Sequence, residues 1–344
     1  MVIVTLSGNL NAPGGVRLRT LHRPLGFVGD RIAFLTLPVN FYITIGIFRE
    51  LSELDVLVAH FYPMTWLAEF TRRLRRKRYI LYNHGILDPS LAGRSSIEKG
   101  YLSTTSALYA STLGNPNETI SISDYARRQL KETTGRDSKV IYNPVDPELF
   151  NTRADSSRIR ARYGVGLSPV ILYVGLIERR KGIHLLVRIH QLVKKKHPNA
   201  VLLLVGRARY EEYLNQIRGE IDESVKIAGW VPNDELGLYF SACDVYATAS
   251  LWEGFNLPLA EAQACGKPVV AFDVGAHREI VEDGETGFLV RPGDVDGFAS
   301  KVTALLSNEG MRHEMGSRGR MTVQQKFDFQ RFSSETKSLI RKLF

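Results

Sequence analysis

The sequence predicts an α/β protein built from two doubly wound domains in tandem. Short apolar strands alternate with helical patterns up to residue 142, and the same alternation restarts at residue 170. Alternation of this kind implies parallel sheets with helices on both faces. Between the two arrays lies a polar tract with Pro144 and Pro147, which is typical of a domain boundary. We therefore predict an N-terminal domain at 1–152, a C-terminal domain at 153–325 and a C-terminal helix at 326–344 that could cross back to the N-terminal domain.

The N-terminal array begins with a strand and a glycine-rich loop. The predicted strands cover residues 2–6, 32–37, 55–59, 79–83, 119–123 and 139–142, and Asp124 is expected to cap the helix that follows the fifth. The loop at 7–16, which contains Gly15, is expected to precede a helix, the usual place for contact with a phosphate or a sugar in an open α/β sheet. Its pattern is not GxGxxG, which excludes a dinucleotide fingerprint, and a simple connecting loop remains the alternative.

Two predicted strands of this array end in histidine. His60 follows DVLVA, and His84 follows YILYN. Ligands of open parallel sheets bind beyond the carboxyl ends of the strands, so both histidines are candidates for a site. His84 is the stronger candidate, because Gly85 leaves space beside its ring. A surface histidine without a role is the alternative.

The C-terminal array places three cations at the end of its first strand. Its predicted strands cover 170–174, 200–205, 225–227, 245–248 and 269–272, with helices at 182–196 and 233–242. Arg179, Arg180 and Lys181 come directly before the first of these helices. Cations at a helix N-terminus, together with free backbone N–H groups, could hold a diphosphate. The alternative is a solvated basic loop.

The stretch from residue 250 to 273, SLWEGFNLPLAEAQACGKPVVAFD, carries the most informative pattern. Gly254 permits close approach of a ligand to the backbone, and Pro258 suits the first turn of a helix. The free N–H groups of that turn form an anion site. Glu253 lies in the loop beside it and Glu261 about one turn into the helix. Two such carboxylates suit a polyhydroxylated anion such as a nucleotide sugar, and a turn followed by a core helix is the alternative.

Net charge and cysteine content limit the classes of binding partner and the cellular compartment that we expect. The net charge is +9 and is spread over both halves, but six cations in seven positions form a basic run. This run could meet an anionic membrane surface or simply end a solvated helix, and without interleaved aromatic residues a nucleic-acid partner is not expected. Cys243 and Cys265 have no disulfide or metal spacing and are read as buried free thiols in a reducing compartment. The residues of the basic run are Arg72, Arg73, Arg75, Arg76, Lys77 and Arg78.

The start of the chain and its most apolar window bear on localisation. The first residues have no basic stretch before the apolar one, so we do not expect a signal peptide. The window at 32–48 is interrupted by Pro38 and Gly46 and is too short for a membrane span. We therefore expect a cytoplasmic protein, peripheral on the inner face of the membrane if the basic run binds lipid.

Taken together, these residues resemble the retaining glycosyltransferases of family four, which have the GT-B fold. The resemblance covers most of 143–296, through YVG…RKG, the long stretch GWVPNDELGLYFSACDVYATAS, then WEGFNLPLAEAQACGKPVVAFDVGAHREIVEDGETGFLV and RPGDVDGFA. In the first half it rests on the shorter pieces PGGV, DVLVAH, His84-Gly85, ISISDYARRQL and NPVD. It implies two Rossmann-like domains with a donor site in the cleft between them.

The resemblance also implies residue roles. Lys181 would bind the diphosphate and balance the charge of the leaving group, Glu253 would hold hydroxyls of the donor sugar, and His84 would lie near that sugar and the acceptor. Glu261 would bind the ribose hydroxyls, and Val231 would contact the base through its backbone. The other donor contacts would be Gly15 near the phosphates and the backbone of Phe255, Asn256 and Leu257.

The chain departs from the family pattern at two positions. Leu176 stands directly after the glycine of YVG, where the family commonly has an arginine that binds phosphate. Arg179 or Arg180 could substitute from the same loop. Asn256 replaces the last glycine of EGFG, a mild change because asparagine tolerates unusual backbone angles.

The expected activity is metal-independent transfer of a sugar from a UDP-, GDP- or ADP-sugar to an acceptor hydroxyl, with retention and without a covalent intermediate, in glycan, polysaccharide or glycolipid synthesis. Lys181 and the helix N-terminus would stabilise the departing phosphate. We read Asp294-Val295-Asp296 as a helix start rather than a metal site. The alternatives are a non-catalytic nucleotide-sugar-binding protein, which Leu176 favours, and a basic peripheral scaffold. A glycan phosphorylase would need a pyridoxal lysine site that the sequence does not reveal.

Overall fold

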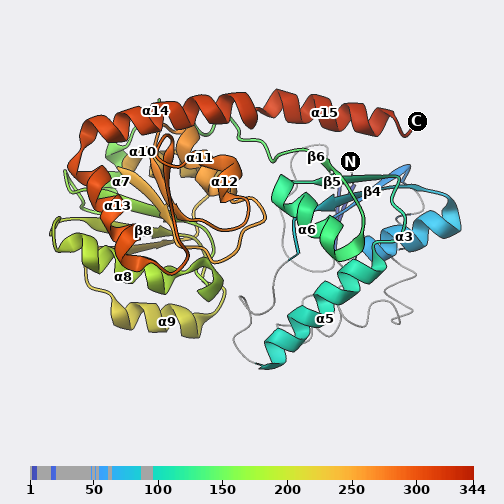
Figure 1. Ribbon diagram of the computed structural model, residues 1–344, viewed down its shortest axis with the longest axis horizontal. Helices are drawn as coiled ribbons and strands as arrows, with labels where there is room; N and C mark the ends of the chain where they lie inside the picture. Colours follow the sequence, from blue (N-terminus) through green and yellow to red (C-terminus); the bar gives the residue numbers. More distant parts are fainter. Residues whose placement is uncertain are drawn as a thin grey trace.

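The structure is a computed structural model that describes residues 2–5, 17–20, 48, 51, 54–60, 64–86 and 96–344. The predicted strand at 32–37 and the glycine-rich loop with Gly15 lie outside the described residues. The described chain forms two α/β halves, and two long helices near the C-terminus run along the same side of both (Figure 1).

The N-terminal half contains a parallel sheet in which β3, β4, β5 and β6 follow one another in sequence order. Strands β1 and β2 pair in a separate parallel ribbon. The helix expected after the glycine-rich loop is therefore wrong at Arg17–Thr20, since the alternating residues RLRT form a strand that pairs with Val2–Thr5. The elements are β1 Val2–Thr5, β2 Arg17–Thr20, β3 Val56–Ala59, α3 Met64–Arg75, β4 Arg78–Asn83, α5 Ser96–Thr112, β5 Glu118–Ser121, α6 Asp124–Thr134 and β6 Lys139–Val140.

The cap of α6 also differs from the prediction. Ser123 is the N-cap residue, and its hydroxyl accepts a hydrogen bond from the backbone N–H of Ala126 at 3.0 Å. Asp124, the predicted cap, is the first helical residue, and its carboxylate pairs with Arg127 and Arg128 instead. Both residue types cap helices well, and the ion pairs that Asp124 makes within α6 leave the cap to Ser123.

The C-terminal half contains six parallel strands in the order β12-β11-β10-β7-β8-β9. Strands β7 and β8, VILYV and VLLLV, are buried along their whole length, as expected for parallel strands covered by helices on both faces. The elements are α7 Ser157–Arg162, β7 Val170–Val174, η2 Arg179–Lys181, α8 Ile183–Lys194, β8 Val201–Val205, α9 Glu211–Glu220, β9 Val225–Gly229, η3 Asn233–Glu235, α10 Leu236–Ala242, β10 Val245–Thr248, α11 Leu257–Ala264, β11 Val269–Phe272, α12 His277–Ile280, β12 Gly287–Val290, α13 Val295–Ser307, α14 Glu309–Lys326 and α15 Phe329–Arg341.

The chain passes between the halves twice, and the two crossings touch. The backbone N–H of Val145, in the first crossing, donates to the carbonyl of Phe327, in the second, at 3.0 Å. Helix α14 lies on the C-terminal half, and α15 continues over the N-terminal half (Figure 1). There Leu339 is buried in the same apolar cluster as Ile80, and Glu335 pairs with Lys139 at 3.6 Å. The domain limits at residues 152 and 325 stay predictions.

Candidate functional site

The strand order of the C-terminal sheet places two of the predicted site loops side by side. The chain winds outward from β7 in one direction and from β10 in the other, and these two strands are hydrogen-bonded neighbours. Ligands of doubly wound sheets bind at such a switch point, beyond the carboxyl ends of the strands. The loop after β7 carries Lys181, and the loop after β10 carries Glu253. The topology therefore explains why residues 72 positions apart meet.

Lys181 and Glu253 form an ion pair at this point. The distance from Lys181 Nζ to Glu253 Oε1 is 2.5 Å, and the exposed fractions of the two side chains are 17% and 8%. Arg180 lies further away, 4.0 Å from the other carboxylate oxygen. Burial opposes ionisation of Glu253, but the charges of Lys181 and then Arg180 hold its pKa below the ordinary value. The carboxyl group of Glu253 is thus ionised in a largely buried site, where electrostatic interactions are strong.

Asn256 opens helix α11 in the left-handed conformation that the sequence suggested, with φ of 82°. Its amide group contacts Nε2 of His277 at 2.8 Å, and Nδ1 of His277 contacts the carbonyl of Phe272 at 2.6 Å. Since a carbonyl only accepts, Nδ1 donates and Nε2 accepts from the amide. The amide is therefore not used as a helix cap, and Pro258 lies in the first turn. His277 holds the loop and was missed by sequence reasoning.

Glu261 lies one turn into α11, as predicted, and is buried with an exposed fraction of 7%. Burial raises the pKa of its carboxyl group to about 8. Without a ligand the group is thus largely neutral at pH 7. A buried, perturbed carboxyl beside a helix N-terminus is a candidate binding group.

His84 and Gly85 of the N-terminal half lie against the loop between β10 and α11, residues 249–256, which we call the donor loop after its predicted role. A Cβ atom added to Gly254 would lie 2.0 Å from the carbonyl oxygen of His84, so only glycine permits this approach. Gly85 packs against the indole ring of Trp252, since a Cβ added there would lie 3.2 Å from Cζ2. His84 Nε2 is 2.7 Å from Nδ1 of His60, the other predicted histidine. The structure therefore brings both histidines to one edge.

Burial keeps the two imidazoles uncharged. It lowers the pKa of His84 to about 4, with a further contribution from His60, and it lowers the pKa of His60 as well. Both rings are therefore neutral near pH 7, and one ring donates to the other.

Two arginines of the basic loop at 179–181 are held by neighbouring groups and do not form an open array of cations. Arg180 donates to the carbonyl of Trp252 at 3.0 Å and pairs with Glu178 at 2.6 Å. Arg179 donates to Gln216 at 3.0 Å and lies over the ring of Tyr213. At position 176 the family commonly has a phosphate-binding arginine, and this chain has Leu176. That Arg179 or Arg180 fulfils the role of this missing arginine stays a prediction.

The carboxyl ends of β8 and β9 carry an exposed pair that sequence reasoning also missed. The guanidinium of Arg207 lies 5.0 Å from the ring centroid of Trp230, and Trp230 is 58% exposed. Val231, the predicted base contact, follows it and is buried. A single sequence offers no signal that these two side chains stack.

Family models match both halves of the chain. The model described as Glycosyltransferase Family 4 matches residues 1–149, and the model described as Glycosyl transferases group 1 matches residues 155–322. The chain belongs to glycosyltransferase family 4. Its fold is GT-B, as the resemblance implied.

Curated relatives of this family 4 glycosyltransferase agree with the family assignment, and solved structures agree with the fold. A GDP-mannose-dependent alpha-(1-6)-phosphatidylinositol monomannoside mannosyltransferase of Mycolicibacterium smegmatis is 29% identical, over 79% of this chain and 73% of the relative. A phosphatidyl-myo-inositol mannosyltransferase of Mycobacterium leprae is 33% identical, over 60% and 54%. Sucrose-phosphate synthase of Thermosynechococcus elongatus has a TM-score of 0.81 at 24% identity, covering 97% and 85%. Anabaena HepE in complex with UDP and glucose has a TM-score of 0.77 at 23% identity, covering 95% and 86%.

Four further findings on this glycosyltransferase bear on the sequence predictions. Asp294 is a helix cap, as predicted, and accepts from the N–H of Gly297 at 2.8 Å. In the described part of the chain no cluster of His, Cys, Asp and Glu could hold a metal ion, and no helix is both long and apolar enough to cross a membrane. Cys243 and Cys265 are buried and free, as expected.

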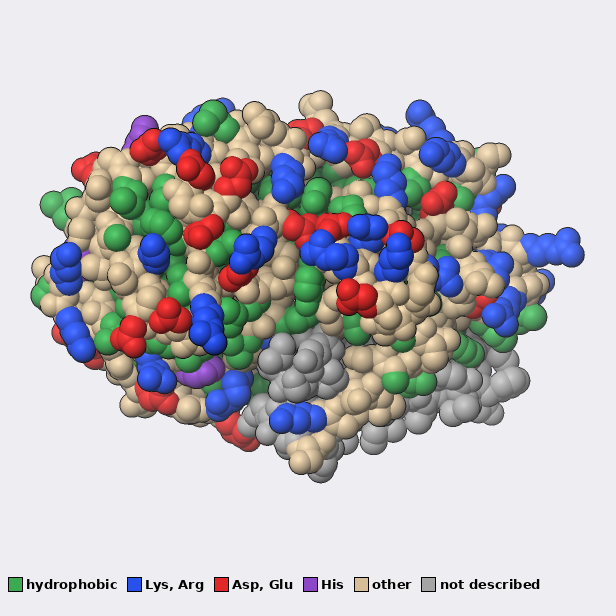
Figure 2. Space-filling model, viewed as in Figure 1, with side chains coloured by type: hydrophobic (Ala, Val, Ile, Leu, Met, Phe, Trp, Pro, Cys, Tyr) green, Lys and Arg blue, Asp and Glu red, His purple; other side chains and the backbone are tan. Residues whose placement is uncertain are grey.

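The basic run begins in the last turn of α3, continues through the connecting residues and ends at Arg78, the first residue of β4. Arg72 and Arg73 pair with Glu69 at 2.8 and 2.6 Å, which neutralises part of the run. Leu74, Arg75 and Arg76 are exposed next to one another. Elsewhere acidic and basic side chains are interspersed on the face seen in Figure 2.

Proposed function

We propose that this glycosyltransferase moves a sugar from a nucleoside-diphosphate sugar to an acceptor hydroxyl, with retention of configuration and without a metal ion. The observation that carries the proposal is the buried Lys181–Glu253 pair beside the start of α11, at the switch point of the sheet. The cation, the free N–H groups and the two carboxyl groups suit the phosphates and hydroxyls of such a donor.

The reaction breaks the bond between the anomeric carbon and the diphosphate oxygen, and it forms a bond from that carbon to the acceptor oxygen. Negative charge grows on the departing phosphate, where Lys181 and the α11 N-terminus would stabilise it. Glu253 would exchange its contact with Lys181 for hydroxyls of the donor sugar. Glu261 would bind the ribose hydroxyls of the donor. Neutral His84 would lie near the donor sugar and the acceptor. The acceptor hydroxyl proton would pass to the departing phosphate, so no enzyme carboxylate needs to form a bond to the sugar.

The donor is tested by thermal unfolding with UDP, GDP, ADP and their sugar conjugates, with magnesium or with a chelator. We expect one nucleotide family to raise Tm equally in both conditions. Glu261→Ala should reduce the shift, whereas Ala at exposed Glu282 should not. If no donor raises Tm, the proposal fails. A shift without nucleoside-diphosphate release from any acceptor would favour the non-catalytic binding protein.

We further infer a lipid-linked acceptor at an anionic, cytoplasm-facing membrane surface. The support is the naming of two relatives as phosphatidylinositol-type mannosyltransferases and the exposed Leu74, Arg75 and Arg76. Changing both arginines to Glu should reduce the fraction of protein that sediments with anionic vesicles. The fraction that sediments with neutral vesicles should not change. The same charge change at exposed Lys195 and Lys196, on the other half, is the matched control. Equal sedimentation of all three proteins would refute the inference.

A further inference from the structure

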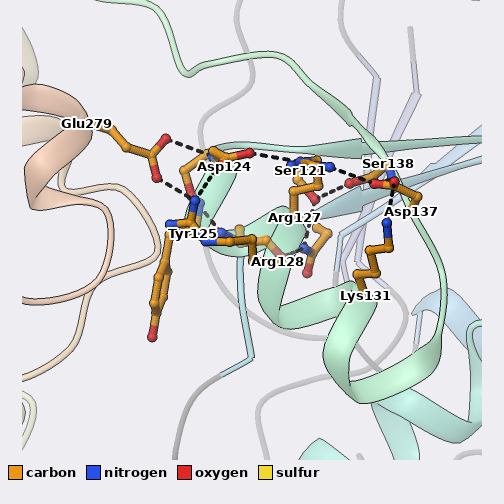
Figure 3. A network of polar contacts seen from close by, with 12 residues as sticks. Ser121, Asp124, Tyr125, Arg127, Arg128, Lys131, Asp137, Ser138 and Glu279 are labelled. Atoms are coloured by element: carbon orange, nitrogen blue, oxygen red, sulfur yellow. Dashed lines mark hydrogen bonds and ion pairs between the residues drawn. The ribbon is translucent and has the colours of Figure 1, made fainter.

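A carboxylate of the C-terminal half binds the first turn of a helix in the N-terminal half. Oε2 of Glu279, on α12, accepts from the backbone N–H of Asp124 at 2.7 Å, and Oε1 accepts from that of Tyr125 at 2.7 Å. Figure 3 shows the side chain of Glu279 reaching both N–H groups at the start of α6. N–H groups at a helix start lack intrahelical partners and carry partial positive charge, so a two-oxygen carboxylate suits them well.

Two further contacts join the N-terminal half to the donor loop, one from the cap of α6 and one from the end of β4. The hydroxyl of Ser123 donates to the carbonyl of Gly254 at 2.6 Å. The carbonyl oxygen of His84 also packs closely against Gly254. Because Gly254 directly follows Glu253, the docking of α6 and the placement of the proposed donor groups depend on one short loop.

Helix α6 does not need Glu279 in order to form. Its own N-cap is supplied by Ser123, and Gly135 ends it in the left-handed conformation. The charge of Asp124, which would repel Glu279, is neutralised by Arg127 and Arg128 (Figure 3). The carboxylate of Glu279 therefore serves the contact between the halves rather than the helix itself.

The backbone of Glu279 is also held in place, by a contact with the end of α14. Its backbone carbonyl accepts from Nζ of Lys326 at 2.5 Å, and this ammonium lies 5.4 Å from the ring centroid of Tyr142. Lys326 ends α14 next to the second crossing, and Tyr142 lies next to the first. Glu279 thus connects the crossings with the donor loop.

We propose that Glu279 is a positioning residue that docks the N-terminal half onto the donor loop and so holds His84 beside the sugar. The proposal rests on the proposed sugar transfer, although the docking itself can be measured without turnover. It assigns to Glu279 no contact with substrate. Its effect should therefore fall on kcat and on the acceptor KM, and not on donor binding, because Lys181, Glu253 and Glu261 all lie on the C-terminal half.

The kinetic test compares Glu279→Ala and Glu279→Gln with Glu282→Gln, an exposed position in the same segment. We expect Glu279→Ala to lower kcat by about tenfold or more, since small displacements of reacting groups are costly. Glutamine keeps one acceptor oxygen and should lower it less. The Kd of the nucleoside diphosphate for the variants should match that of the control.

The docking is measured through Trp252, which packs against Gly85 across the interface. Changing Trp66 and Trp230 to Phe leaves Trp252 as the fluorophore. In ligand-free protein, Glu279→Ala should shift its emission to longer wavelength and increase quenching by acrylamide. Unchanged emission and quenching, or a kcat equal to that of the control, would overturn the proposal. If the wild-type protein transfers no sugar, the proposed function fails, and the fluorescence still decides the docking.

Discussion

Lys181→Ala is expected to reduce sugar transfer by about 100- to 1,000-fold, the loss seen when a preorganised charge-stabilising group is removed. Lys181 provides the cation that the structure places closest to Glu253, and Arg180 is held at 4.0 Å by its own contacts with Glu178 and Trp252. The remaining arginine therefore cannot take over the position of Nζ without breaking those contacts. Initial rates at saturating donor and acceptor measure the effect.

A matched set of variants separates the catalytic loss from a loss of stability. Lys181→Ala leaves the Glu253 carboxylate buried with a weaker partner, which should lower the free energy of unfolding. Adding Glu253→Gln removes that charge and should restore the stability but not the activity. Lys181→Arg keeps the charge and should retain part of the rate. Recovery of activity in the double variant would show that Lys181 acts only by neutralising Glu253.

Glu261 should make a contribution to the free energy of unfolding that falls as pH rises from about 4.5 to about 8. Its ordinary pKa is 4.5, and burial raises it to about 8 in the folded protein. In this range the unfolded chain has lost the proton and the folded chain still holds it. Stability from this group is thus complete below the lower value and lost as pH rises through the upper one. The slope is at most about 1.4 kcal/mol per pH unit, so the total is a few kcal/mol.

Glu261→Gln isolates this contribution, because glutamine resembles the neutral carboxyl at every pH. Urea unfolding at pH 5.5 and pH 8 should show the variant gaining stability relative to the wild type as pH rises. Glu282→Gln, at an exposed position, should follow the wild type. Parallel pH profiles for the wild type and Glu261→Gln would contradict a raised pKa at this position.

The C-terminal half could be predicted closely because its signals are local. Strands such as VILYV and VLLLV are continuous apolar runs, and Pro258 marks the start of α11 within a residue. The site loops follow from the order of these strands. In the N-terminal half, RLRT gave no comparable signal, and its strand depends on pairing with Val2–Thr5.

The contacts that sequence reasoning missed are long-range. Glu279 and Asp124 are separated by 155 positions, and Asn256 and His277 by 21. Nothing near Glu279 in the sequence indicates that its partner is a helix start in the other half. Capping by Ser123 rather than Asp124 has a local origin instead, because the carboxylate of Asp124 pairs with Arg127 and Arg128 one turn later in the same helix. Patterns thus locate elements, and the polar contacts between elements need their relative placement.

The paired crossings at Val145 and Phe327 determine how the chain can be divided. A fragment that ends near residue 150 would include every described strand of the N-terminal sheet but would lack α15. It would then expose the apolar surface that Leu339 covers and lose the partner of Lys139. The N-terminal half is therefore discontinuous in sequence, and its last piece is translated after the whole C-terminal half. During synthesis on the ribosome, the first half must wait for the second before its surface is complete.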